Sequence, residues 1–338
     1  MERAAISVAG LSKHFGSVTA LDRIDFEVRA GAVVGLLGPN GAGKSTVIRI
    51  LTTILRPSAG HAEVLGHDVV RDAPEVRRLI GLAGQFAAVD PNLTGRENLR
   101  LIGRLTQLPR ARLRPRAAAL LDRFDLTAAA DRPVRTYSGG MRRRLDVAAA
   151  LVGEPPVLFL DEPTTGLDPQ SRNALWELIR ELVDDGTTVL LTTQYLEEAD
   201  RLAERVVVVD QGLVIADDTP AALKGRLGST VIELGMGDQD RAARAAAVIT
   251  ARLAGTPQLA GTPQLAEAPQ TEGARLTLAS RDGSGALLDV LHLLDTNGLV
   301  PRTVEVRESS LDDVFLALTG HRTNTGPATG SDTPGGPP

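Results

Sequence analysis

Short runs of apolar residues alternate with longer amphipathic segments over the first two thirds of the chain. Such runs are typical of buried strands, and the amphipathic segments are typical of helices. The predicted strands are 33–37, 80–83, 157–160, 188–192 and 206–209, and helices are predicted after residue 46, at 171–184 and at 196–203. Because strands and helices alternate, we expect an α/β fold, with a mostly parallel sheet and helices on both of its faces.

The pattern changes at two places along the chain. Residues 95–152 are predicted to be helical, with helices at 98–105, 116–124 and 141–152. Beyond residue 228, shorter strands and helices predict a small separate α+β domain over 229–320. The last residues, 321–338, combine glycine and proline with no apolar periodicity, so we expect a disordered tail there. The predicted organisation is therefore a large domain, 1–228, a small domain and a tail.

A glycine-rich segment directly follows the predicted strand 33–37. It fits the pattern G-x-x-x-x-G-K-[ST] and comprises Gly38, Pro39, Asn40, Gly41, Ala42, Gly43, Lys44, Ser45 and Thr46. Glycines let the backbone wrap around an anion, so that its N–H groups point at phosphates beside the start of a helix. Lys44 is expected to reach the β- and γ-phosphates, and Ser45 to offer its hydroxyl to Mg²⁺. Chance alone produces this pattern in on the order of one chain in a hundred, so the rest of the sequence must decide.

Two adjacent carboxylates end the predicted strand 157–160. Ligands of parallel α/β sheets bind beyond the carboxyl ends of the strands, and carboxylates there are costly unless they are used. Asp161 is a candidate Mg²⁺ ligand, acting through water, and Glu162 is a candidate to orient and polarise an attacking water molecule. The alternative is a structural pair that caps the next turn.

Two further features are ambiguous by themselves. Ser138, Gly139 and Gly140 open the predicted helix 141–152, where they form either a simple helix cap or a second group of exposed N–H donors. Phe15 is either a core aromatic or a residue that packs on the ring of a ligand. The arginines between 104 and 116 predict a solvated helical face, with anionic lipid head groups as the alternative partner.

Composition narrows the possible functions. The net charge of the 338-residue chain is −5, so no overall basic field favours nucleic acid. The chain has no cysteine, which excludes disulfides, thiolate metal sites and a cysteine nucleophile. No apolar run approaches the roughly 20 residues that span a bilayer, and no signal peptide is visible. If the protein works at a membrane, we expect it to dock on another protein.

Together with Gln194, these motifs resemble the nucleotide-binding domain of ABC transporters, a P-loop NTPase fold with a helical subdomain. The resemblance implies that Phe15 stacks on adenine and that Gln85 senses Mg²⁺ and the membrane partner. It further implies that Ser138–Gly140 belong to the signature motif and that Glu162 is catalytic. Gln194 stands where the family normally has a histidine that contacts the γ-phosphate, so it is the second predicted catalytic residue. Glutamine can donate a hydrogen bond there but cannot carry a positive charge.

Three segments resemble one subfamily, the ATP-binding subunits of daunorubicin/doxorubicin-resistance exporters: 84–90, 192–200 and 311–320. The resemblance implies ATP and Mg²⁺ as cofactors and a homodimer that encloses two ATP molecules. It also implies a separate multi-span membrane permease, a peripheral position at the cytoplasmic face of the membrane, and no nucleic-acid partner. The predicted function is to power the export of hydrophobic drug-like or antibiotic molecules. The alternatives are export of a native lipid or glycan, and a soluble ABC ATPase that acts on ribosomes or DNA.

Overall fold

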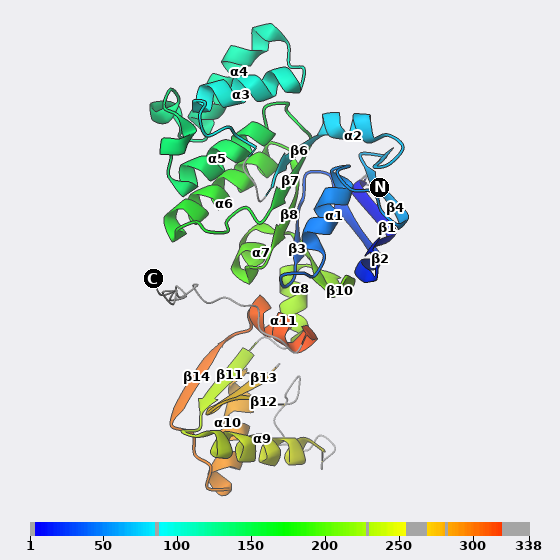
Figure 1. Cartoon of the computed structure of the whole chain (residues 1–338). Coiled ribbons are helices and arrows are strands. Elements are labelled where there is room, and N and C mark those ends of the chain that lie inside the picture. Colours follow the sequence, from blue (N-terminus) through cyan, green and yellow to red (C-terminus); the bar gives the residue numbers. More distant parts are fainter. Residues whose placement is uncertain (1–3, 85–87, 228–229, 255–268, 281–282, 320–338) are drawn as a thin grey trace, which may run out of the picture.

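The computed structural model describes residues 4–84, 88–227, 230–254, 269–280 and 283–319. Its central sheet has six strands in the order β10-β9-β3-β8-β7-β6 (Figure 1). These are β3 (Val33–Leu37), β6 (Ile80–Ala83), β7 (Val157–Asp161), β8 (Thr188–Thr193), β9 (Arg205–Asp210) and β10 (Leu213–Asp218). All neighbouring pairs are parallel except β9 and β10. The expected mostly parallel sheet is confirmed, and the antiparallel edge strand β10 is an addition that the sequence analysis did not predict.

Residues near the N-terminus form a second, antiparallel sheet. Its order is β2-β1-β4-β5, with β1 (Ala4–Phe15), β2 (Val18–Arg29), β4 (Ala59–Val64) and β5 (His67–Asp68). Helix α1 (Lys44–Leu51) packs between the two sheets, because its apolar residues share one core cluster with residues of β1, β2, β3 and β7. The short helix α2 (Ala73–Leu79) leads from this sheet to β6.

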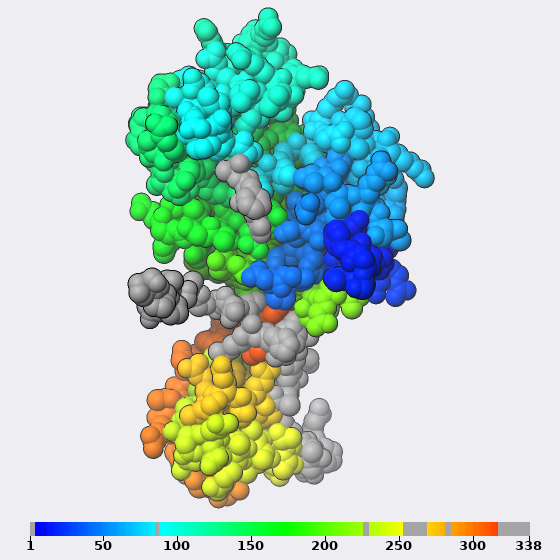
Figure 2. All heavy atoms as spheres, viewed as in Figure 1, coloured from blue at the N-terminus to red at the C-terminus, as the bar shows by residue number. Residues whose placement is uncertain are grey.

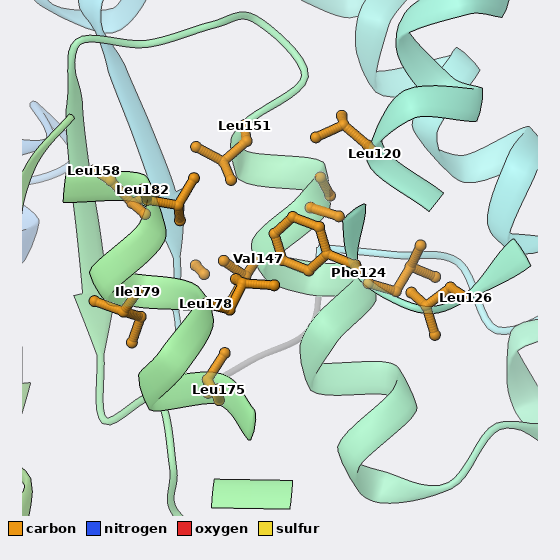
Figure 3. Packing of buried hydrophobic residues seen from close by; sticks show 14 of the residues in the cluster. Leu120, Phe124, Leu126, Val147, Leu151, Leu158, Leu175, Leu178, Ile179 and Leu182 are labelled. Carbon is orange, nitrogen blue, oxygen red and sulfur yellow. The ribbon is translucent and has the colours of Figure 1, made fainter. Parts of the chain in front are cut away.

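The opposite face of the central sheet carries the helices that the sequence placed at 95–152. They are α3 (Gly95–Leu105), α4 (Arg110–Arg123) and α5 (Gly139–Ala150), joined by the 3-10 turns η1 (Thr127–Ala129) and η2 (Val134–Thr136). Helix α6 (Pro169–Asp184) belongs to the same core cluster. Figure 3 shows Phe124, just after α4, lying between Val147 of α5 and Leu126. Along β7 the side chains alternate between the two faces of the sheet, since Phe159 joins the α1 cluster and Leu158 the α5 cluster.

The C-terminal part has its own sheet and its own core. The sheet order is β12-β13-β11-β14, all antiparallel, with β11 (Thr230–Gly235), β12 (Gln270–Glu272), β13 (Arg275–Ser280) and β14 (Thr303–Glu308). Helices α9 (Gln239–Ala254) and α10 (Gly283–Thr296) cover this sheet and complete its core cluster. Figure 2 shows this unit as a lobe beyond the larger one. The separation of 229–320 as a domain stays a prediction.

The last helix returns to the large lobe. In α11 (Leu311–Thr319), Leu311, Val314 and Phe315 are buried in a cluster with residues of α7 (Leu196–Leu202), α8 (Pro220–Leu227) and β9. Arg307 of β14 joins the small sheet to this helix, since its guanidinium donates to Glu233 of β11 and to Asp313 of α11. The expected disordered tail lies outside the described residues. No helix in the described part of the chain is long and apolar enough to cross a membrane.

Candidate functional site

The glycine-rich loop runs from the end of β3 into the first turn of α1. Gly43 has φ 108°, and a Cβ atom there would lie 2.6 Å from the carbonyl oxygen of Ala20. A Cβ atom on Gly38 would lie 2.1 Å from the carbonyl oxygen of Val209. Both positions therefore require glycine. Gly43 needs it for its backbone conformation and for the close approach of Ala20, and Gly38 needs it for its close contact with β9.

Lys44 begins α1 and is only 4% exposed. Its ammonium group donates hydrogen bonds to the carbonyl oxygens of Gly38, at 2.8 Å, and Pro39, at 2.9 Å. Burial lowers the pKa of Lys44, and the negative charges of Glu162 and Asp161 oppose that shift. The loop thus closes around a buried cation, with two carboxylates near enough to act on its charge.

Asp161 joins three elements at the end of β7. Its Oδ1 atom accepts a hydrogen bond from the hydroxyl of Ser45 in α1, at 3.1 Å, and another from the hydroxyl of Thr192 in β8. Asp161 and Thr192 are register partners of the parallel pair β7 and β8, which explains why their side chains meet. The sequence analysis assigned no role to Thr192. The sequence could have indicated this contact, because Thr192 carries a hydroxyl at the end of the predicted strand 188–192, as Asp161 follows the end of the predicted strand 157–160.

The same corner has the donor set of a magnesium–nucleotide site. No group of three or more His, Asp or Glu residues that could hold a metal ion occurs among the described residues. One hydroxyl and one carboxylate do converge, at Ser45 and Asp161. Mg²⁺ typically keeps several waters and binds one or two protein oxygens together with substrate phosphates, so this donor set fits such an ion. Gln85, the third predicted ligand, lies outside the described residues.

Glu162 occupies an uncommon backbone conformation directly after β7. Its φ is 48°, and its N–H group donates to both the carbonyl oxygen and the hydroxyl of Thr192, at 3.1 and 3.0 Å. Its Oε2 atom accepts a hydrogen bond from the hydroxyl of Thr165, at 3.2 Å. The side chain lines a cavity of about 540 Å³ that also borders Gly139 at the start of α5 and Gly166. The main chain and the side chain of Glu162 are thus both fixed beside an open space.

The segment Ser138–Gly140 starts α5, as predicted from the sequence. Ser138 is the N-cap, and its hydroxyl accepts a hydrogen bond from the N–H group of Met141, at 3.2 Å. Ser138 and Gly139 are exposed, whereas Gly140 is buried against Ser171, whose Oγ atom would lie 2.5 Å from a Cβ atom there. Helices α5 and α1, which begin at the two predicted phosphate-binding segments, belong to core clusters on opposite faces of the central sheet.

The remaining predicted residues are placed as follows. Phe15 ends β1 and is 46% exposed, with the Lys13 ammonium 5.0 Å from the centre of its ring, so it is not a core aromatic. Gln194 directly follows β8 and is partly buried. Its side chain makes no hydrogen bond to any other residue that the structure describes. Both side chains are therefore available to a ligand.

Arg143 and Asp146 of α5 also reach the corner at Glu162, and the sequence analysis did not identify them. Arg143 donates to main-chain oxygens on both sides of Glu162, and Asp146 is 2% exposed. Burial raises the pKa of Asp146, while the Ala88 N–H group and Arg143 oppose that shift. The helical period could have indicated that Arg143 faces inward, because it lies four residues before the fully buried Val147.

A buried carboxylate lies in α7, four residues after Gln194 in the chain. Glu198 of α7 is 1% exposed, and its Oε1 atom accepts a hydrogen bond from the indole N–H of Trp176, at 3.2 Å. Its Oε2 atom has no hydrogen-bond partner among the described residues. Burial raises the pKa of Glu198 above its ordinary value of 4.5. The ionised form is therefore disfavoured in the folded protein relative to the unfolded chain.

We expect the stability of this protein to decrease, relative to a Glu198→Gln variant, as pH rises above 4.5. The folded-state pKa is raised, so the folded protein holds a proton that the unfolded chain has already lost, and this contribution to stability disappears as pH rises through the folded pKa. The measurement is the free energy of unfolding of both proteins at about pH 5 and about pH 8. A difference between the two proteins that is the same at both pH values would contradict the assignment.

This chain is similar to known ATP-binding proteins in sequence and in fold. The family described as "ABC transporter" matches residues 21–165. The chain is 51% identical to "Daunorubicin resistance ATP-binding protein DrrA2" of Streptomyces coeruleorubidus, over 96% of this chain and 97% of the relative. It is 40% identical to "Nod factor export ATP-binding protein I" of Ralstonia nicotianae, over 93% of this chain and 94% of the relative. A solved dimeric ATP-binding cassette in a post-hydrolysis state with ADP and phosphate has a TM-score of 0.58 and 27% identity, over 63% of this chain and 98% of that chain.

Proposed function

This chain belongs to the ABC transporter family, and from that premise we propose that it powers the export of hydrophobic drug-like or antibiotic molecules through a separate membrane permease. Like other ATP-binding subunits of the family, it binds and hydrolyses ATP. The observation that carries the ATP-hydrolysing part of the proposal is the convergence of Lys44, Ser45, Asp161 and Glu162 at one corner of the central sheet. These are a phosphate-binding cation, two candidate Mg²⁺ ligands and a candidate base.

We propose that the phosphates of ATP lie on the N–H groups of residues 38–46. Lys44 would then exchange its hydrogen bonds to the Gly38 and Pro39 carbonyls for bonds to the β- and γ-phosphates. Ser45 and Asp161 would hold Mg²⁺, with Gln85 as the third predicted ligand, and the ion would neutralise charge on the phosphates when bound. Phe15 is exposed at the end of β1, where its ring is free to stack on adenine.

Glu162 is proposed as the residue that orients water for attack on the γ-phosphate. Its carboxylate can accept a proton from that water, and the hydrogen bond from Thr165 fixes one of its two oxygens. Ser45 and Thr192 both donate to Asp161, which keeps that carboxylate at the metal side of the corner. The two adjacent carboxylates thus have separate roles because their hydrogen-bond partners differ.

Gln194 is proposed as the γ-phosphate contact, acting as a neutral hydrogen-bond donor. We expect Gln194→Ala to lower kcat by about tenfold, since the loss of one donor to a charged group costs about 1.5 kcal/mol or more. Gln194→His should retain activity, because imidazole also offers an N–H donor. The measurement is steady-state ATP hydrolysis by the three proteins. Equal turnover in all three would mean that Gln194 does not contact the phosphate.

We propose that two copies of this chain enclose two ATP molecules. Helices α1 and α5 pack on opposite faces of the central sheet, and in the proposed dimer Ser138, Gly139 and Gly140 of one copy contact the nucleotide held by Lys44 of the other. Ser138 and Gly139 are exposed, as such a contact requires. The solved cassette that resembles this chain is a dimer with ADP and phosphate.

The proposed permease contact involves the outer surface of α3. Leu101 and Leu105 lie one turn apart and are 41% and 73% exposed, which makes a small apolar surface suited to a protein partner. Arg112 pairs with Glu154, and Arg116 donates to the Leu151 carbonyl oxygen. These internal bonds favour the solvated helical face over lipid binding. We place the protein at the cytoplasmic face of the membrane, bound through its permease, with no nucleic-acid partner.

The proposal is tested by purifying this chain from native membranes after gentle detergent solubilisation and identifying the proteins that accompany it. A polytopic membrane protein in stoichiometric amount is expected, and its bound small molecules would reveal the cargo. A native lipid or glycan is the alternative cargo, which the bound small molecules would equally reveal. Recovery only in the soluble fraction, with ribosomes, DNA or no partner, would contradict export.

A further inference from the structure

One arginine of α5 binds the main chain around the proposed catalytic glutamate. The guanidinium of Arg143 donates from Nε to the carbonyl oxygen of Pro163, at 2.7 Å, and from Nη2 to that of Asp161, at 3.1 Å. Its Nη1 atom donates to the carbonyl oxygen of Gly84 at the end of β6, at 2.6 Å. The side chain is 13% exposed. A planar guanidinium is suited to this task, because its donors are held in a fixed geometry.

The two carbonyls at Asp161 and Pro163 stand immediately before and after Glu162. That residue has φ 48°, a conformation that costs a non-glycine residue about 1 kcal/mol or more. Its N–H group is held by Thr192, and both flanking carbonyls are held by Arg143. The surrounding contacts thus fix the backbone on which the carboxylate of Glu162 depends.

Asp146 completes the arrangement one turn further along α5. Its Oδ2 atom lies 3.4 Å from Nη1 of Arg143, so the buried charges compensate each other. Its Oδ1 atom accepts a hydrogen bond from the N–H group of Ala88, at 2.7 Å. Two side chains of α5 therefore bind three parts of the main chain. Arg143 binds Gly84 after β6 and the turn after β7, and Asp146 binds the N–H group of Ala88.

We propose that Arg143 is a positioning residue for ATP hydrolysis, which holds Glu162 in its productive orientation and ties it to the start of α5. This inference rests on the proposed function, in which α5 contacts the nucleotide of the second copy. A movement of Ser138–Gly140 toward that nucleotide would then reach Glu162 of the same chain through one guanidinium. The chain would adjust its own catalytic residue according to how it engages its partner's ATP.

The test compares the hydrolysis kinetics of Arg143→Gln and Arg143→Lys with those of the original protein. We expect Arg143→Gln to lower kcat by about 10- to 100-fold with KM and the Kd for ATP within about twofold, because misplacing a catalytic group slows the chemical step without removing a ligand contact. Arg143→Lys should restore part of kcat, since one ammonium cannot reproduce the planar set of donors. Unchanged kcat in both variants would overturn the inference.

The matched control is Arg144→Gln. Arg144 is the next residue of α5 and also donates to a carbonyl oxygen, that of Phe124 at 3.1 Å, but it does not contact the turn at Glu162. Its loss should leave kcat within about twofold. Equal losses of kcat in the Arg143 and Arg144 variants would show a general effect on α5 and overturn the inference. If Arg143→Gln does not fold, Arg143→Lys decides alone: original kcat overturns the inference, and lowered kcat with unchanged Kd supports it.

A double variant separates this inference from the role of Glu162 itself. In a Glu162→Gln background, adding Arg143→Lys should slow the residual rate by less than about twofold, because the group that Arg143 positions is already inactive. A full further loss would overturn the inference. If Glu162→Gln alone turns ATP over normally, the proposed function of Glu162 fails. If Glu162→Gln is inactive but the Arg143 variants are normal, only the positioning role fails.

Discussion

Glu162→Gln is expected to lower ATP hydrolysis by about 10²- to 10⁴-fold, the contribution of a positioned general base. Glutamine has nearly the same shape, so the hydrogen bond from Thr165 and the positive φ can persist, but an amide cannot accept a proton from water. ATP binding should remain, and the protein should accumulate as an ATP-bound dimer. The measurements are steady-state hydrolysis and size-exclusion chromatography with ATP.

Glu181→Gln is the matched control, because Glu181 is an exposed carboxylate of α6 away from the nucleotide corner. It should retain the original turnover and dissociate after hydrolysis. Normal turnover by Glu162→Gln would show that another group activates the water, and the role given to Glu162 would be wrong. Loss of hydrolysis without a stable dimer would separate the chemical role of Glu162 from the proposed dimer closure.

Lys44→Met is expected to weaken ATP binding by about 10- to 100-fold, and hydrolysis with it. A hydrogen bond between a charged donor and a phosphate contributes about 1.5–3 kcal/mol, and methionine keeps most of the side-chain volume without the charge. The unfolding free energy without nucleotide should change by only about 1 kcal/mol. The hydrogen bonds to Gly38 and Pro39 disappear, but so does a buried ammonium group whose desolvation was unfavourable.

Nucleotide titration and thermal denaturation of the same samples check this prediction. Lys224→Met is the matched control, because Lys224 pairs with Asp200 on α7 and does not contact the loop. Undiminished ATP affinity in Lys44→Met would rule out the loop as the phosphate site. A large loss of stability without nucleotide would instead show that the ammonium group holds the loop together.

Several parts of the fold and site could be predicted from the sequence because their signals are local. The strands β3 and β6 have the predicted bounds, since each is a short apolar run that is followed by a glycine. The strand before residues 38–46 and the helix after them could also be predicted, because strand, glycine-rich loop and helix are adjacent in the chain. Strand β10 was not predicted, because it is an edge strand whose residues are mostly exposed or partly buried and give no continuous apolar signal.

Contacts between distant segments could not be predicted in the same way. Thr192 meets Asp161 only because β7 and β8 are paired in parallel register, which no local pattern encodes. The return of α11 to α7 and α8 depends on the path of the whole small lobe, although its apolar residues were visible in the sequence. Position in space, unlike residue type, is set by packing that involves the entire chain.

The sequence by itself determined which chemical groups this protein has: a phosphate-binding loop with Lys44, a carboxylate pair at the end of a strand, a glycine-rich helix start, and glutamine at position 194. These signals are local because each depends on a few consecutive residues. The tertiary structure alone decided that Arg143 binds the carbonyls beside Glu162 and that α1 and α5 pack on opposite faces of the sheet. Both follow from how helices cover a parallel sheet, since the face that each helix covers brings some distant groups together and keeps others apart.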